Sequence, residues 1–122
     1  MSNEITYNFQ TVLKNGTLQD QYASGPLAAS QVSALLIRNV ANITIAAGGE
    51  ALALGDVATP GIAIFSNLDI TNYVEIGSFV GGTFYPFLKL GAGEQVMAKL
   101  SVVPYARANT ATVNLFYAIY SA

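Results

Sequence analysis

The chain has 122 residues, of which 52% are apolar and only 10% are charged, and its formal net charge is −2. It contains neither cysteine nor histidine, which excludes disulfides, thiolate metal sites, cysteine nucleophiles and the commonest general base. The basic residues are too scattered to follow a phosphate backbone, which excludes an electrostatic nucleic-acid binder; they are Lys14, Arg38, Lys89, Lys99 and Arg107.

The first local unit is a predicted β-hairpin over residues 4–22. Asn15 and Gly16 are the strongest short-range signal for a two-residue type I′ turn, and they separate two strand-like segments. With this pair at the tip, the predicted cross-strand partners are Leu13 with Leu18 and Phe9 with Tyr22. Residues 1–24 are therefore expected to form an N-terminal hairpin. The alternative is an arm whose first residues reach a neighbour.

Residues 27–60 follow a Gly-Pro break and have no clear period. Alanine and leucine would suit a helix, but the β-branched residues favour one or two strands between about 31 and 46. Asn39–Asn42 predict a bend or bulge within this segment. A short strand or extended loop is expected to begin at Glu50.

Residues 61–77 predict a strand, a polar corner at Ser66–Asn72, and a second strand. Residues 83–90 alternate in polarity, and Pro86 restricts them to an edge strand or a bulge. Two further alternating segments end the chain, at residues 95–103 and 111–120. The inward positions of the last segment are predicted to be Val113, Leu115, Tyr117 and Ile119.

Together these segments predict an all-β protein with eight or nine short strands, joined by Gly, Pro and Asn turns. Such a pattern is typical of an antiparallel β-sandwich of jelly-roll type. No linker, charge run or low-complexity segment divides the chain, so residues 1–122 are expected to form a single domain.

Part of the chain resembles small virion proteins of tailed bacteriophages. The resemblance covers about residues 54–121, in the runs LGDVATPGIAIFSNLDITNYVEIG, FYPFLKLGAGEQVMAKLS and YARANTATVNLFYAIYS. Its most specific parts are the NLD-x-TN-x-VEIG corner and the FxPFLKLxxGE loop. It does not extend to the first 53 residues. The resemblance implies a β-sandwich that is an accessory structural component of the particle, on head or tail.

Four carboxylates could in principle supply the catalytic pair of a glycoside hydrolase: Asp56, Asp69, Glu75 and Glu94. They stand beside Gly or Asn in turns, or on a polar strand face, where solvated carboxylates are ordinary. Asp69 and Asn67 could contribute to a calcium site, but the spacing of a dedicated loop is absent and local Asx turns are favoured. No catalytic, metal-binding or cofactor-binding residue is predicted.

Five aromatic residues are predicted on the outward side of their strands: Tyr73, Tyr85, Phe87, Phe116 and Tyr120. One interpretation is that both faces of each sheet are buried within the domain. The other is a subunit interface, which we favour because an average domain has about 25% charged residues and this chain has 10%. An exterior rich in uncharged polar residues is the alternative explanation of the low charge. We expect a homo-oligomer, either a dimer or a trimer.

The expected function is that of a structural component of a bacteriophage particle, as an accessory capsid, decoration or tail-associated protein. Its expected partners are copies of itself and other virion proteins, without nucleic acid or membrane. The alternatives are a carbohydrate- or receptor-binding module of a tail fibre and, more weakly, a glycoside-acting enzyme. Residues 1–10 lack the basic and apolar regions of a secretory signal, so no leader is expected, and without a run of 18 apolar residues no transmembrane helix is expected. The expected location is the virion, after synthesis in the host cytoplasm.

Overall fold

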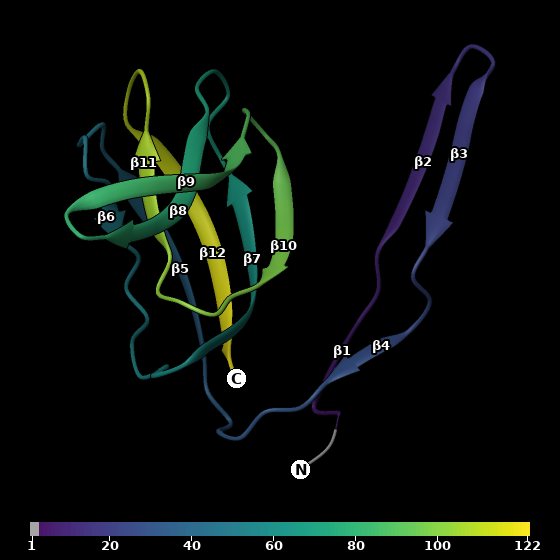
Figure 1. The fold of residues 1–122 in the computed structure, drawn as a ribbon, viewed down its shortest axis with the longest axis horizontal. Helices are drawn as coiled ribbons and strands as arrows, with labels where there is room; N and C mark the ends of the chain where they lie inside the picture. The colour runs from purple at the N-terminus through teal and green to yellow at the C-terminus, as the bar shows by residue number, and fades with distance from the viewer. Residues whose placement is uncertain (1–2) are drawn as a thin grey trace. The chain divides into compact units, whose positions relative to one another are not determined.

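The computed structural model describes residues 3–122, which form strands and contain no helix (Figure 1). Contacts divide the chain into two compact units, Met1–Ser33 and Ala34–Ala122. The single domain predicted for residues 1–122 is thus two units. The physical reason is that the hydrophobic core is built from residues 37–119, so the N-terminal hairpin contributes nothing to it.

The first unit is one long hairpin that consists of two short antiparallel ladders, one after the other along the chain. Strand β1 pairs with β4, and β2 pairs with β3. A backbone hydrogen bond from Ser24 N to Phe9 O, together with one from Phe9 N to Ser24 Oγ, joins the two ladders. The strands are β1 (Ile5–Tyr7), β2 (Gln10–Asn15), β3 (Leu18–Ala23) and β4 (Leu27–Ala29).

The tip of this hairpin differs from the prediction by one residue. Asn15 pairs with Leu18, so the turn residues are Gly16 and Thr17. Only Gly16 has a positive φ, of 61°, which corresponds to a type II′ turn with glycine at its first central position. The predicted type I′ turn and its cross-strand partners are therefore wrong: Leu13 pairs with Asp20, and Thr11 with Tyr22.

The second unit is a sandwich of two four-stranded antiparallel sheets, ordered β10-β7-β12-β5 and β6-β11-β8-β9. This order is that of an eight-stranded jelly roll, as the sequence predicted. With the four strands of the hairpin the total is twelve, more than the eight or nine expected. The strands are β5 (Leu36–Ile43), β6 (Glu50–Ala51), β7 (Pro60–Asn67), β8 (Val74–Val80), β9 (Thr83–Leu90), β10 (Gln95–Lys99), β11 (Tyr105–Ala108) and β12 (Val113–Ser121).

Strand β5 runs without the bend that was predicted at Asn39–Asn42. Its eight residues pair continuously with β12. The asparagines find partners on that neighbour, because Asn39 Nδ2 donates to Tyr117 Oη at 3.2 Å and Asn42 Nδ2 donates to Asn114 Oδ1 at 3.0 Å. Cross-strand hydrogen bonds of this kind allow asparagine to sit within a ladder instead of ending it.

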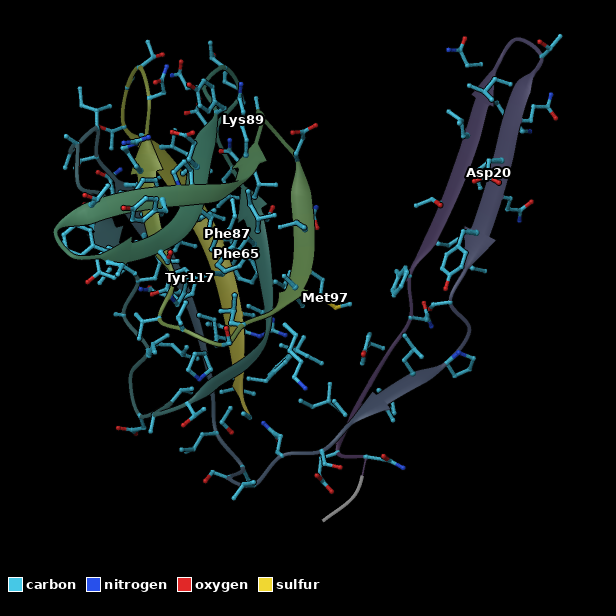
Figure 2. All side chains as sticks on the ribbon, viewed as in Figure 1. Asp20, Phe65, Phe87, Lys89, Met97 and Tyr117 are labelled. Atoms are coloured by element: carbon cyan, nitrogen blue, oxygen red, sulfur yellow. The ribbon has the colours of Figure 1, made fainter. Side chains whose placement is uncertain are left out.

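The core lies between the two sheets, and both contribute to it. Phe65 and Tyr117 are the largest fully buried side chains (Figure 2). The Tyr117 hydroxyl donates to the Ala53 carbonyl at 2.8 Å, which satisfies the polar end of this ring. The predicted inward positions of the last strand are confirmed, since Val113, Leu115 and Ile119 are also fully buried.

Pro86 lies on β9, which is an edge strand of its sheet. The β8–β9 ladder shifts register between Ile76 and Gly77, where Gly77 pairs with Pro86. Both predicted consequences of this proline, an edge position and a bulge, are therefore confirmed. A side chain at Gly77 would collide with the Tyr85 carbonyl, so the bulge requires glycine there.

Candidate functional site

Three of the four candidate catalytic carboxylates, Asp69, Glu75 and Glu94, make hydrogen bonds or an ion pair within the fold. Glu75 forms an ion pair with Arg107 at 2.8 Å. Glu94 Oε1 accepts the Gly91 N–H at 2.5 Å and so closes the loop before β10. Among residues 3–122, no group of three or more His, Cys, Asp or Glu side chains is placed to hold a metal ion.

The polar corner between β7 and β8 is organised by Asn67, which is 1% exposed. Its Nδ2 donates to the carbonyl oxygens of Asn72, Leu90 and Gly91 at 2.9, 3.0 and 3.1 Å. Its Oδ1 accepts the Asp69 N–H at 2.9 Å. Asn67 therefore ties the corner to the end of β9, and its side-chain oxygen is occupied.

Asp69 closes an Asx turn in the same corner. Its Oδ2 accepts the N–H groups of Asn72 at 2.6 Å and Thr71 at 3.0 Å. These two donors, Asn72 first, hold the pKa of Asp69 below its ordinary value of 3.8, because they stabilise the carboxylate form. The Asx-turn interpretation of Asn67 and Asp69 is confirmed by this geometry.

The outer face of the β6-β11-β8-β9 sheet carries a charged row. Lys89, Glu75 and Arg107 are direct cross-strand neighbours on β9, β8 and β11. Lys89 Nζ lies 4.1 Å from the ring centroid of Tyr73, and the Arg107 guanidinium lies 4.7 Å from that of Phe84. This face therefore presents alternating charges to water, each beside a partner.

Three of the predicted interface residues lie on or next to strands of the β6-β11-β8-β9 sheet. Tyr85 and Phe87 are 55% and 54% exposed on the edge strand β9, where they flank Pro86. Tyr73 is half-buried beneath Lys89. Phe87 also borders an open hollow of about 180 Å³, lined by Glu75, Pro86, Phe87, Leu88 and Lys89.

The outer face of the β10-β7-β12-β5 sheet is largely apolar, although Asn42, Ser66, Gln95 and Asn114 also lie on it. Its side chains alternate with the core residues along each strand, so cross-strand register identifies them. We call this surface the apolar outer face; its main members are Leu36, Val40, Ile64, Met97, Phe116 and Tyr120. Leu36 and Val40 are 56% and 53% exposed.

The charges of the apolar outer face are both positive. Arg38 lies beside Ala118 on β5 at one edge of the face, and Lys99 lies on β10 at the other edge. Among the strand residues on this face there is no carboxylate. Met97 projects away from β10 on the side opposite the core (Figure 2).

The five predicted interface residues therefore do not form one surface. Phe116 and Tyr120 are half-buried on the apolar outer face, whereas the other three lie with the opposite sheet. Sequence reasoning missed Leu36 and Val40. Their alternation with Ile37 and Ala41 was the available signal, but the asparagines of this segment were interpreted as a bend.

The N-terminal hairpin has two unlike faces. Register places an apolar row on one face of β2 and β3, which we call the hairpin stripe; it consists of Phe9, Leu13, Leu18 and Tyr22. Phe9 and Tyr22 stack with ring centroids 5.8 Å apart. The stripe residues are 45–59% exposed, and Asp20 pairs with Leu13 on the same face.

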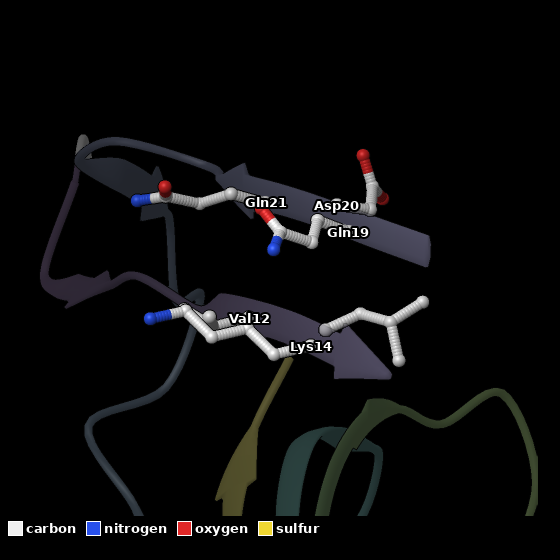
Figure 3. A pocket seen from close by; sticks show the side chains of 6 residues that line it. Val12, Lys14, Gln19, Asp20 and Gln21 are labelled. Atoms are coloured by element: carbon white, nitrogen blue, oxygen red, sulfur yellow. The ribbon is translucent and has the colours of Figure 1, made fainter. Parts of the chain in front are cut away.

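The opposite face of the hairpin is mainly polar. Lys14, Gln19 and Gln21 project to one side of the ladder and Asp20 to the other (Figure 3). Val12 is the large apolar residue of the polar face and is 56% exposed. Side chains of the two strands border a shallow hollow of about 340 Å³. The hairpin is thus amphipathic, although all residues of β2 and β3 are exposed.

Comparison with known proteins gives no family for this chain. No family model matches it, no curated protein matches it, and no solved structure matches it. Within residues 3–122, no helix is long and apolar enough to span a membrane. The functional argument therefore depends on the surfaces described above.

Proposed function

We propose that the chain is a structural component of a bacteriophage particle, as an accessory capsid, decoration or tail-associated protein. It acts through contacts with copies of itself and with other virion proteins. The observation that carries this proposal is the apolar outer face, where Leu36 and Val40 expose more than half of their surface, Val40 beside Phe116. A largely apolar exposed face on a chain with so few charges is typical of a protein–protein interface.

The free energy gained by burying these apolar side chains supports association through this face. Burying a Val, Leu or Phe side chain contributes about 1.5–3 kcal/mol relative to leaving it exposed. Leu36, Val40 and Phe116 together can therefore offset a substantial part of the entropic cost of joining two subunits. The charged row on the other sheet has no comparable tendency, because solvated ion pairs contribute about 0–1 kcal/mol each.

The fold agrees with the proposal but supports it less than the apolar outer face does. Jelly rolls are frequent in viral capsid proteins and also in lectin domains, so the architecture agrees with the proposal without deciding it. The resemblance of residues 54–121 to small phage virion proteins points the same way. The corner and loop motifs of that resemblance coincide with the Asn67 hydrogen-bond network, which is a structural feature and not a catalytic one.

A carbohydrate- or receptor-binding role has less support. Such a site needs exposed aromatic rings that converge with amide or carboxylate groups in one groove. The hollow beside Phe87 measures about 180 Å³, below the range of about 300–1,000 Å³ that is usual for ligand pockets. The structural role is therefore preferred to the glycan-binding and enzymatic alternatives.

The proposal is tested by the mass of the protein in native solution. We expect an oligomer for the unmodified chain, and a smaller species for Leu36→Asp combined with Val40→Asp, because two carboxylates would be desolvated at the contact. Ile70→Asp is the matched control, since Ile70 is 94% exposed in the corner and lies outside the face. A monomer for the unmodified chain at all concentrations, or equal masses for both variants, would contradict the proposal.

A further inference from the structure

The N-terminal hairpin lacks the burial that would stabilise it. All residues of β2 and β3 are exposed, although six cross-strand pairs order them. An isolated two-stranded hairpin is marginally stable at best in water, and packing against a further surface is the usual remedy. The hairpin stripe, with its stacked Phe9 and Tyr22, is the face suited to such packing.

The apolar outer face has matching properties. It is a sheet surface that exposes Leu36 and Val40 on the edge strand β5, beside Tyr120 and Phe116 on β12, and a two-stranded ribbon can pack on such a surface. Six residues of β2 span about 20 Å, and the eight residues of β5 span about 27 Å, so the ribbon fits along the strands.

The hairpin stripe and the apolar outer face also carry opposite charges. Asp20 is the charged residue on the stripe side of β2 and β3, whereas Lys14 belongs to the polar side. The apolar outer face carries Arg38 and Lys99 and, within its strands, no carboxylate. Docking the stripe on the face brings opposite charges together and leaves the polar face of the hairpin in water.

We propose that the hairpin stripe docks on the apolar outer face of a second copy of this chain, with Asp20 directed towards Arg38. This inference rests on the proposed self-assembly and specifies its contact. Each copy carries one hairpin stripe and one apolar outer face. Two copies can therefore each dock their stripe on the face of the other, which forms a closed dimer with both surfaces covered. Two dockings per pair also bring the buried area closer to the about 1,200–2,000 Å² of stable interfaces.

The absence of native cysteine allows a clean cross-linking test. A Leu13→Cys chain and an affinity-tagged Val40→Cys chain are co-expressed, purified together and oxidised. A disulfide forms only where the two Cα atoms approach within about 7 Å. We expect mixed covalent dimers in at least about five-fold excess over the matched control, in which Val12→Cys replaces Leu13→Cys. Val12 is 56% exposed but belongs to the polar face.

The outcomes separate this inference from the proposed function. Equal cross-linking of Leu13→Cys and Val12→Cys overturns the docking. A chain carrying both Leu13→Cys and Val40→Cys that closes only within itself also overturns it, because the contact is then not between copies. If either result comes with an oligomeric native mass, self-assembly stands and only this contact is wrong. A monomeric native mass overturns both.

A charge exchange supplies a second measurement. Asp20→Arg and Arg38→Asp are each expected to raise the dissociation constant of the assembly several-fold, since each places like charges together. The two changes in one chain are expected to restore it, because opposite charges then meet again. Failure of the double variant to recover would overturn the pairing of these residues.

Discussion

At the scale of single residues, Asn67 holds the corner between β7 and β8. Three carbonyl oxygens depend on its amide group, and the side chain is 1% exposed. Buried acceptors that lose their donor cost about 1–3 kcal/mol, because water cannot replace it. The corner is therefore a point where one substitution affects two loops.

We expect Asn67→Ala to lower the free energy of unfolding by about 2–3 kcal/mol. Urea denaturation followed by circular dichroism measures this change. Asn114→Ala is the control, because Asn114 is exposed and its loss is expected to cost no more than about 0.5 kcal/mol. A similar loss in the two variants would show that the Asn67 network does not stabilise the fold.

Asp69 gives the same corner a pH dependence. Its pKa in the folded state is lowered by the Asn72 and Thr71 N–H groups. Its contribution to stability is therefore fully present above the unfolded value near 3.8, and is lost as the pH falls through the lowered folded value. Melting temperatures between pH 7 and pH 2 should fall less steeply below pH 4 in Asp69→Asn. Parallel curves for the two proteins would refute this.

At the scale of elements, the hairpin turn depends on Gly16. Its φ of 61° disfavours residues with a side chain, although a Cβ there would meet nothing within 4 Å. We expect Gly16→Val to destabilise the hairpin by about 1 kcal/mol or more, seen as faster amide exchange in β2 and β3. The hairpin contributes no residue to the core of the sandwich, so any fall in its melting temperature is expected to come only from weaker docking of the hairpin in the assembly.

Thr17→Val is the control for this prediction. Thr17 is the second turn residue and does not have a positive φ, so valine there places the same side chain in the turn without the backbone strain. Equal amide exchange in the two variants would mean that the positive φ of Gly16 is not what stabilises the turn.

The elements with strong local signals were predictable from the sequence. β9 and β12 alternate clearly and β7 is a short apolar run, and all three are bounded by Gly, Asn or Pro, so their positions follow from side-chain pattern and turn chemistry. β5 was predicted with a bend because asparagine usually marks turns, and only tertiary pairing with β12 shows otherwise. The hairpin turn was predicted one residue too early, because Asn15-Gly16 and Gly16-Thr17 are both acceptable turn pairs.

The candidate surface was only partly predictable, for a different reason. Alternation predicts that Phe116 and Tyr85 both point outward, but not that their strands belong to different sheets, nor that the register shift at Pro86 places Tyr85 opposite Ser78, on the face that carries Ile76. Sheet membership depends on strand order, which is a long-range property of the jelly roll. The contrast between a charged and an apolar outer face therefore appears only in the folded sandwich.

At the scale of the whole molecule, Tyr85 and Phe87 test whether β9 belongs to an interface. Both are more than half exposed, so Tyr85→Asp combined with Phe87→Asp is expected to leave the protein folded. The native mass of the double variant is expected to equal that of the unmodified chain, because the proposed self-contact uses the apolar outer face of the other sheet. An unfolded variant would assign these rings to the core. A monomeric double variant would place the self-contact on β9 and contradict the apolar outer face as the interface.

The contrast between the two broad faces of the sandwich has a consequence for how the protein behaves in thin films. One face carries the Lys89–Glu75–Arg107 row, and the other carries Leu36 and Val40. At an air–water boundary the apolar side is adsorbed and the charged row stays hydrated. Free subunits spread for electron microscopy will therefore show a strongly preferred orientation, which covering the apolar side in an assembly will relieve.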